Sequence, residues 1–157
     1  MYNFAPSGYI CPICVTLDGK ETKDTLIKQK DIVYKDKLVT AFIASFFIGK
    51  NPGHVIVVPN EHFENIFDLP SKFALRIHQV SKRVSVALKQ GYKAEGITLL
   101  QNNGPEGGQH AFHYHLHVFP RHKGDRLHKF MDSKKQSDTK TRAKYANILK
   151  PLLKTVK

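Results

Sequence analysis

Short apolar runs separated by turn-forming residues predict several β-strands along the chain. Residues 31–46 are rich in β-branched and aromatic types and predict two short strands that turn at residues 35–37. Residues 53–59 are apolar throughout, which predicts a strand in the middle of a sheet. Residues 97–101 and 112–119 predict two further strands, joined by a glycine-rich loop.

Between these strands lies a segment whose apolar residues recur at three- and four-residue steps, as on one face of an α-helix. The helix is expected to begin near Ser71, directly after Pro70, and to end at Gly91. Its apolar face consists of Phe73, Ile77, Val80, Val84 and Leu88.

The C-terminal part of the chain predicts a loop followed by a second helix. Residues 123–140 have few apolar side chains and carry turn signals at residues 124–125 and 132–133. From about Asp138 a partly periodic pattern predicts a helix, whose apolar face must dock on the remaining structure if the helix is to be stable. The apolar positions are Ala143, Ala146, Ile148, Leu149 and Leu152.

These elements together predict an α+β fold. Five strands, one long helix laid over them and a C-terminal helix indicate an antiparallel five-stranded sheet with the long helix packed on it. A chain of 157 residues corresponds to about one domain and is long enough for one hydrophobic core.

Three histidines alternate with apolar residues in the last predicted strand. Because successive side chains of a strand point to opposite faces, His113, His115 and His117 are expected to line one face about 6.6 Å apart. Tyr114 and Leu116 would then face the core. Three imidazoles in a row gain nothing from packing, so the pattern indicates a phosphate or a metal as their partner.

A glycine-rich stretch, residues 102–109, enters the histidine strand. Glycine permits a positive φ and lets a ligand approach the bare backbone, and consecutive N–H groups in such a turn can bind an anion. A glycine-rich loop alone is a weak signal. Its connection to a His-x-His-x-His strand makes it a strong one.

The formal charge of +12 is concentrated near the C-terminus. Residues 121–157 hold twelve Lys or Arg and three Asp, a net +9. Such a block can attract nucleic acid or polyphosphate, or it can be a solvated helical face or a mobile tail. No apolar run approaches the roughly 18 residues of a membrane span, and the first residues do not resemble a secretory signal, so a cytoplasmic location is expected.

The two cysteines, Cys11 and Cys14, form a Cys-Pro-Ile-Cys motif. A reducing compartment disfavours a structural disulfide, which leaves metal binding or redox chemistry. A redox motif of the thioredoxin kind follows a strand and opens a helix. Here a polar stretch follows the motif, so we favour a metal.

The segment of residues 107–121, Gly-Gly-Gln-His-Ala-Phe-His-Tyr-His-Leu-His-Val-Phe-Pro-Arg, resembles the signature of the histidine triad (HIT) family of nucleotide hydrolases and transferases. The resemblance extends to residues 52–59 and to Glu61-His62. It implies a HIT-like fold over residues 1–125, with a basic, helical extension at residues 126–157 that is part of the same domain. It also implies a homodimer in which two protomers join their sheets.

The resemblance further implies cleavage of a nucleoside phosphoramidate, a dinucleoside polyphosphate or a similar nucleotidyl substrate through a phosphohistidine intermediate. In this interpretation His115 is the nucleophile. His117 stabilises the phosphate oxygens or the departing group. Gln109 binds the transferring phosphoryl oxygen or the scissile bridge.

The remaining site residues follow from the same resemblance. Backbone N–H groups at Gly107 and Gly108 would complete the phosphate clamp, and Asn102 would contact substrate. His54 matches a histidine that lies beside the triad, where a structural role and a direct one both remain open. His110 stands where relatives often have Ser or Thr, which leaves the protonation of the leaving group open.

Some bacterial histidine triad proteins, and the related galactose-1-phosphate uridylyltransferases, complete a zinc site on a cysteine pair with two histidines. The matching positions here are His62 and His113, which with Cys11 and Cys14 would give four ligands and tether residues 1–20 to the sheet. Such a closed site would be structural, so no catalytic cofactor is expected. The alternative is two free thiols, with His113 hydrogen-bonded to His54 or to the backbone.

Residues 42–51 depart from the family pattern, because they lack the carboxylate with which many members bind the ribose hydroxyls. Phe46 and Phe47 offer aromatic rings for a base instead, or belong to the core. Two other functions remain open. One is a metallohydrolase in which His113, His115 and His117 hold a catalytic metal; the other is a non-catalytic binder of nucleotides or nucleic acid that uses the basic tail.

Overall fold

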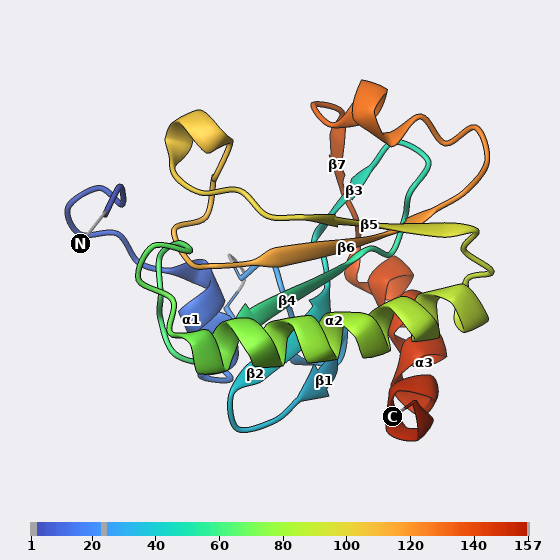
Figure 1. Cartoon of the computed structure of the whole chain (residues 1–157), viewed down its shortest axis with the longest axis horizontal. Coiled ribbons are helices and arrows are strands. Elements are labelled where there is room, and N and C mark those ends of the chain that lie inside the picture. Colours follow the sequence, from blue (N-terminus) through green and yellow to red (C-terminus); the bar gives the residue numbers. More distant parts are fainter. Residues whose placement is uncertain (1–2, 23–24, 157) are drawn as a thin grey trace.

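The computed structural model describes residues 3–22 and 25–156 and has the α+β fold that the apolar pattern predicts (Figure 1). Five antiparallel strands form the main sheet in the order β1-β2-β4-β6-β5. Their bounds are Ile32–Lys35 for β1, Val39–Ile43 for β2, Val55–Pro59 for β4, Gly96–Leu100 for β5 and Leu116–Arg121 for β6. The central position predicted for residues 53–59 is confirmed by β4.

Two helices cover one face of this sheet. Helix α2, Ser71–Gly91, begins after Pro70 and ends at the predicted glycine, and helix α3, Thr139–Thr155, begins after its N-cap Asp138. The apolar faces of both helices pack on alternate residues of the strands and form the largest core cluster. Tyr114 and Leu116 belong to this cluster, which confirms their predicted orientation toward the core.

The opposite face of the sheet carries shorter elements. Helix α1, Pro12–Leu17, packs there through Ile13, which clusters with Phe42 and Val58. The 3-10 turn η1, Gln29–Asp31, directly precedes the edge strand β1 and contacts α3. The 3-10 turn η2, Pro105–Gly107, lies in the glycine-rich loop. None of the described helices is both long enough and apolar enough to cross a membrane.

The prediction that residues 123–140 form only a loop is wrong. This segment contains the 3-10 turn η3, Leu127–Phe130, and strand β7, Lys134–Gln136. Strand β7 pairs antiparallel with strand β3, Phe46–Ile48, as a separate ribbon beside the main sheet (Figure 1). Its polar sequence gives no strand signal, because the pairing depends on a partner that lies far away in the chain.

The histidine strand also differs from the prediction. Strand β6 begins at Leu116, not at Phe112, because the backbone before it bonds elsewhere: the Tyr114 N–H donates to the Phe63 carbonyl oxygen at 2.6 Å, and the Phe112 N–H donates to the Tyr9 hydroxyl at 3.1 Å. His113 and His115 therefore precede the strand. The expectation that three histidines share one face of one straight strand is wrong.

A buried ion pair anchors helix α3 to the N-terminal half of the chain. The Arg142 guanidinium, 1% exposed, donates from Nε and Nη2 to Asp31 Oδ2, at 2.9 Å in each case. It also donates to the carbonyl oxygens of Leu26 and Ser137. The basic C-terminal segment is thus docked on the sheet through the core as well as through these polar contacts.

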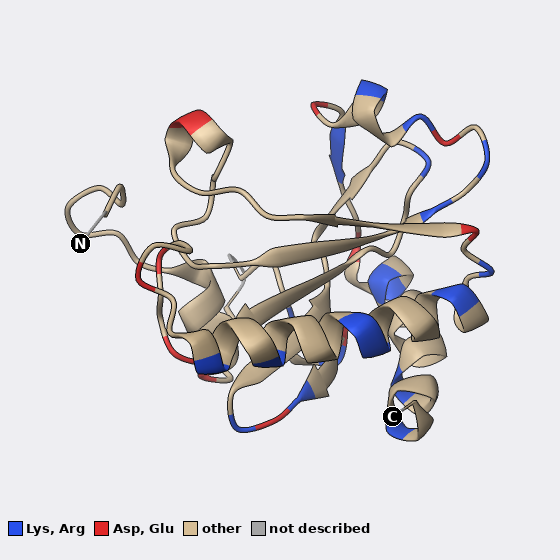
Figure 2. Cartoon of the chain, in the orientation of Figure 1, with Lys and Arg blue, Asp and Glu red and all other residues tan. Residues whose placement is uncertain are grey.

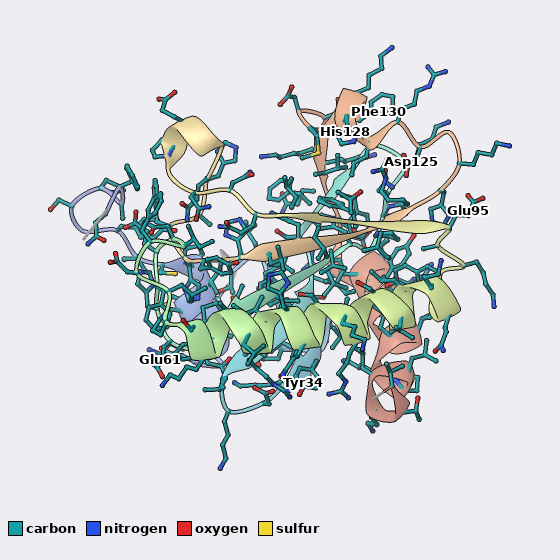
Figure 3. The ribbon with its side chains drawn as sticks, viewed as in Figure 1. Tyr34, Glu61, Glu95, Asp125, His128 and Phe130 are labelled. Carbon is teal, nitrogen blue, oxygen red and sulfur yellow. The ribbon has the colours of Figure 1, made fainter. Side chains whose placement is uncertain are left out.

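A second buried carboxylate holds the end of β6 and the segment that leads to β7. Asp125 accepts two hydrogen bonds of 2.8 Å from Arg121 and one of 2.7 Å from the Asn51 amide. These bonds, of which those from Arg121 are the strongest, hold the pKa of Asp125 well below its usual range. Figure 3 shows Asp125 and Phe130 on the side of the sheet opposite α2, where Phe130 packs against Phe119 and Leu127.

Candidate functional site

A pocket of about 760 Å³ opens on the face of the sheet opposite α2. Its floor is the sheet itself, and its walls come from the N-terminal segment, the glycine-rich loop and the β3–β7 ribbon. The polar residues at its centre are His54, His115 and His117. The residues that surround them include Tyr9, Ile10, Ile13, Phe42, Ala44, Ser45, Phe46, Ile56, Asn102, Gly108, His110, Phe119, Met131, Asp132 and Lys134.

His115 is held in one tautomer by the backbone. Its Nδ1 lies 2.7 Å from the carbonyl oxygen of His113. A carbonyl only accepts, so Nδ1 carries the proton and Nε2 keeps a free lone pair. Burial lowers the pKa of His115, and the nearby His110 and Lys134 add to this effect. The ring is therefore neutral and nucleophilic near pH 7.

His117 and His54 form a second imidazole pair beside His115. His117 Nδ1 lies 3.3 Å from His54 Nε2, and the His117 ring centroid lies 5.1 Å from that of His115. Burial lowers the pKa of His54 to about 3, and burial together with His54 and His115 lowers that of His117 well below its usual value. An incoming phosphate favours the protonated form of these rings, so the pair can supply positive charge when an anion arrives.

The side-chain amide of Gln109 is hydrogen-bonded to three backbone groups. Its Oε1 accepts from the Gly104 N–H at 2.8 Å, and its Nε2 donates to the carbonyl oxygens of Glu64 and Ala111 at 2.6 and 3.0 Å. Gln109 is 3% exposed and is not among the residues that line the pocket. Direct contact with substrate would require some of these bonds to break, and the predicted contact stays a prediction.

The glycine-rich loop reaches the pocket at two of the predicted positions. Asn102 and Gly108 line the cavity, and Asn102 Nδ2 donates to the Gly108 carbonyl oxygen at 3.2 Å. Gly108 has a φ of +78°, which glycine adopts without strain. Gly107 does not line the pocket.

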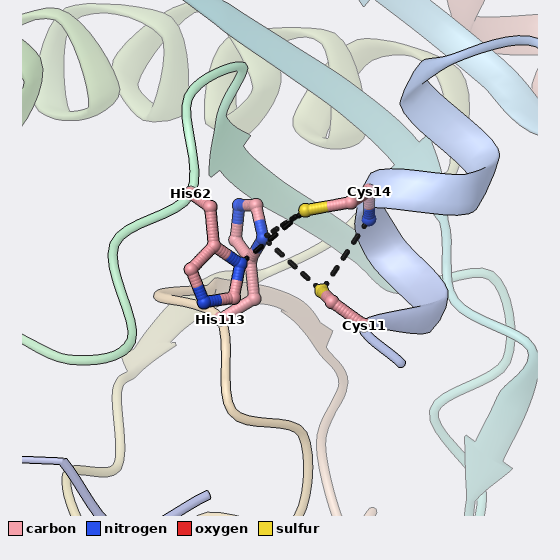
Figure 4. Close-up of side chains that lie close together, drawn as sticks. All are labelled: Cys11, Cys14, His62 and His113. Atoms are coloured by element: carbon pink, nitrogen blue, oxygen red, sulfur yellow. Dashed lines mark hydrogen bonds between the residues drawn. The ribbon is translucent and has the colours of Figure 1, made fainter. Parts of the chain in front are cut away.

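Four potential metal ligands converge at the N-terminal end of helix α1 (Figure 4). Nδ1 of His113 lies 3.4 Å from Cys11 Sγ and 3.5 Å from Cys14 Sγ, and Nδ1 of His62 lies 3.3 Å from Cys14 Sγ. All four ligand atoms lie within 4.8 Å of one another. Tetrahedral zinc bonds of about 2.0–2.3 Å place ligand atoms roughly 3.3–3.8 Å apart, so the donor set and these three nitrogen–sulfur distances fit zinc.

The hydrogen bond of His113 on its other side strengthens this fit. His113 Nε2 donates to the Pro59 carbonyl oxygen at 3.0 Å, so the lone pair of Nδ1 faces the two sulfur atoms. Metal-bound histidines commonly donate their second N–H in this way. Burial lowers the pKa of His113 to about 4, which keeps the ring neutral as a metal ligand must be.

The expectation that the Cys-Pro-Ile-Cys motif does not open a helix is wrong. Cys11 caps helix α1 and Cys14 lies within it, so the motif does open a helix. The geometry nevertheless favours a metal, because the ligand atoms of both cysteines converge with those of His62 and His113. Burial, followed by the neighbouring Cys11, raises the pKa of the Cys14 thiol, whereas redox-active cysteines have a lowered pKa. Both cysteines are free thiols.

The triad histidines do not form a metal site of their own. Among the described residues, the cluster of Cys11, Cys14, His62 and His113 is the one group of three or more potential ligands that converge. His113 contributes to that cluster, while His115 and His117 line the pocket. The geometry therefore separates one member of the triad from the other two.

Several pocket residues could not be found from the sequence. Asp132 and Lys134 come from the segment expected to be a loop, and Tyr9 and Ile10 come from the N-terminal segment. None belongs to a motif, because each reaches the pocket through tertiary packing. Of the two phenylalanines considered for base stacking, Phe46 lines the pocket, whereas Phe47 packs on Tyr145 with a centroid distance of 5.5 Å.

Comparison with known proteins identifies the class to which this fold and site belong. The model of the HIT domain family matches residues 26–124. An uncharacterised HIT-like protein of Saccharolobus solfataricus is 31% identical over 150 residues, which cover 94% of this chain and 99% of that protein. The chain therefore belongs to the HIT family. The purine nucleoside phosphoramidase of Escherichia coli is 29% identical over 89 residues, 56% of this chain and 73% of that enzyme.

Solved structures show the same fold. A hypothetical histidine triad nucleotide-binding protein from Sulfolobus tokodaii superimposes with a TM-score of 0.76 and 26% identity over 92% of each chain. A zinc-bound histidine triad family protein from Mycobacterium smegmatis gives a TM-score of 0.72 and 25% identity, and covers 92% of this chain and 93% of its own.

Proposed function

We propose that this HIT family member is a nucleotidyl hydrolase or transferase that acts through a covalent intermediate on His115. The observation that carries the proposal is the 2.7 Å contact between His115 Nδ1 and the His113 carbonyl oxygen. This contact leaves Nε2 unprotonated in a ring that lines a pocket large enough for a nucleotide. The similarity to a purine nucleoside phosphoramidase supports the same chemistry.

In the first step, Nε2 of His115 attacks the α-phosphorus of the substrate. A nitrogen–phosphorus bond forms, and the bond from phosphorus to the leaving nitrogen or oxygen breaks. The leaving group departs with the electron pair and takes a proton from solvent or from a neighbouring imidazole. The adduct is cationic, because Nδ1 keeps its proton, and the His113 carbonyl oxygen stabilises that charge.

In the second step, water attacks the adduct. A phosphorus–oxygen bond forms, the nitrogen–phosphorus bond breaks, and its electron pair returns to Nε2 of His115 while the water proton passes to solvent. His117, with His54 behind it, supplies positive charge to the phosphate oxygens in both steps. The backbone at Gly108 and the amide of Asn102 border the same space.

The direct test is turnover by the purified chain. Incubation with adenosine 5′-phosphoramidate and with diadenosine triphosphate is expected to release AMP from at least one of them. Treatment with a chelator under conditions that leave unchanged both the circular dichroism and any zinc held by Cys11, Cys14, His62 and His113 should preserve the rate. Loss of the rate without loss of fold would instead favour a metallohydrolase, and no release of AMP from either compound would contradict the proposal.

A purely nucleic-acid-binding function has less support. Figure 2 shows Lys and Arg on β7, α2 and α3, but two of the basic side chains near the C-terminus, Arg121 and Arg142, are engaged in internal ion pairs. Truncation near residue 125 would not isolate such a function, because it would remove Ala146 and Leu149 from the core.

We also propose that Cys11, Cys14, His62 and His113 hold a structural zinc ion. Zinc there would fix the N-terminal segment, which forms one wall of the pocket, and would hold His113, whose carbonyl oxygen orients His115. The zinc-bound relative from Mycobacterium smegmatis supports this assignment. Thiolate ligands must stay reduced, so we propose a cytoplasmic location.

Replacing His62 with asparagine is expected to lower the zinc content from about one ion per chain to near zero, because a three-ligand site loses closure and affinity. The melting temperature should fall with it. Metal content by mass spectrometry and melting by calorimetry are the measurements, and the exposed His78, changed to asparagine, is the control. Zinc retained at one equivalent in the His62 variant, or absent from the wild type purified without chelators, would contradict the proposal.

We further propose a homodimer formed through strand β5. Within the described part of the chain, β5 pairs only with β6, so its outer edge is open. Leu99 on this strand is 44% exposed, and the open backbone edge can pair with the same edge of a second chain. Sedimentation at the mass of a single chain at micromolar concentration would exclude this dimer.

A further inference from the structure

Strand β7 brings a lysine to the pocket from the segment after residue 125. In the β3–β7 ribbon, Lys134 is paired with Ile48, and both residues line the pocket. Side chains alternate along a strand, so the next residue, Lys135, points to the other face of the ribbon. Lys135 is not among the pocket residues.

Lys134 lines the same pocket as the reactive histidines His115 and His117. Its charge contributes to lowering the pKa of His117, after the larger effects of burial and of the neighbouring histidines. No hydrogen bond or ion pair engages its ammonium group among the residues that the structure describes. The ammonium is therefore available for a ligand beside the histidines.

The position of the Lys134 ammonium beside the histidines indicates what that ligand is. Among the described lining residues, Lys134 is the one Lys or Arg, and Asp132 is the one carboxylate. His115, His117 and the loop backbone can accommodate one phosphoryl group. A second phosphate attached to it brings further negative charge, and Lys134 is the cation placed to meet it.

We infer that Lys134 binds the phosphate next to the one transferred, so that the site is suited to substrates with two or more consecutive phosphates. This inference rests on the proposed function, whose attack site it takes as the position of the first phosphate. It names the substrate class as nucleoside polyphosphates, including dinucleoside polyphosphates, in preference to phosphoramidates. The transferred nucleotidyl group is the same in polyphosphates and in phosphoramidates. Selectivity between these substrates therefore comes from contacts with the leaving group.

The ribbon that carries Lys134 is held firmly enough to position it. The Ser137 N–H donates to the Ser45 carbonyl oxygen at 2.9 Å, which extends the pairing beyond β7. The segment before β7 is fixed by Asp125 and by Phe130, whose ring packs directly against Gly49. A Cβ atom added at Gly49 would lie 2.8 Å from Phe130 Cβ, so the two residues are in tight contact.

Equilibrium binding tests the inference without turnover. The probes are AMP and α,β-methylene-ADP, which differ by one phosphate and contain no cleavable bond between the two. The wild type is expected to bind the diphosphate analogue about tenfold more tightly than AMP, as one charge-assisted contact in a solvated pocket would give. Lys134→Met should abolish this preference and leave AMP affinity within about twofold. Lys135→Met, which removes the same charge from the other face, should keep the preference.

Steady-state kinetics provides a second test of the role of Lys134. Lys134→Met should lower kcat/KM for diadenosine triphosphate about tenfold and change that for adenosine phosphoramidate less than threefold. An unchanged preference in Lys134→Met, an equal loss with both substrates, or an equal effect of Lys135→Met would overturn the inference. Absence of turnover in the wild type would refute the proposed hydrolase instead, and the binding arm would still decide the role of Lys134.

Discussion

Replacing His115 with alanine is expected to lower kcat by about 10⁴-fold with either substrate class, while the fold remains intact. The change removes the nitrogen that the contact between His115 Nδ1 and the His113 carbonyl oxygen leaves unprotonated and aimed at the substrate. Loss of a covalent nucleophile typically costs this much, since only binding and electrostatic stabilisation remain. Rates of AMP release under saturating substrate are the measurement.

Two controls make this result specific. The melting temperature and the AMP affinity of His115→Ala should stay close to the wild-type values, which would separate chemistry from folding and binding. His128→Ala removes an exposed imidazole on η3, outside the pocket, and should leave kcat unchanged (Figure 3). Turnover by His115→Ala within tenfold of the wild type would remove this residue from its proposed role.

Replacing Arg142 with methionine is expected to destabilise the fold by about 3–5 kcal/mol. The side chain is buried, and its removal leaves the fully buried carboxylate of Asp31 without its cation and the Leu26 carbonyl oxygen without its donor. In a chain of this size such a loss corresponds to a melting temperature lower by roughly 10 °C. Denaturant unfolding and calorimetry provide the two measurements.

The matched control is Lys144→Met, which removes the same charge from an exposed position on the same helix and should change stability by less than about 0.5 kcal/mol. The double variant Asp31→Asn with Arg142→Met should be more stable than the sum of the two single losses, because it leaves no unpaired charge in the core. Equal stability of Arg142→Met and Lys144→Met would show that the pair does not anchor α3.

The sequence predicts the regular part of this fold well, because its elements are determined by local periodicity. The apolar steps from Phe73 to Leu88 and the glycine at position 91 predict α2 with its observed end, and Asp138 marks the start of α3. The continuous apolar run at residues 53–59 predicts the central strand β4. These signals depend on residues a few positions apart, so the sequence alone is enough to predict these elements.

The parts that could not be predicted depend on contacts distant in sequence. The backbone of Tyr114 bonds with Phe63, so strand β6 begins only at Leu116, and the His113 side chain joins the cysteine cluster. Strand β7 forms because Phe46–Ile48 is available as its partner, although Lys134 and Lys135 carry no strand signal. The convergence of Cys11 with His113 was expected from the family resemblance and not from spacing.

The most direct test of the central claim is to catch the covalent intermediate. Wild-type protein is mixed with diadenosine triphosphate, quenched within milliseconds in alkaline detergent and examined by intact-protein and peptide mass spectrometry. We predict one adenylyl group per chain, attached to His115 and absent from His115→Ala. Steady turnover by the wild type with the adduct on another residue, or with no adduct at any quench time, would contradict the account.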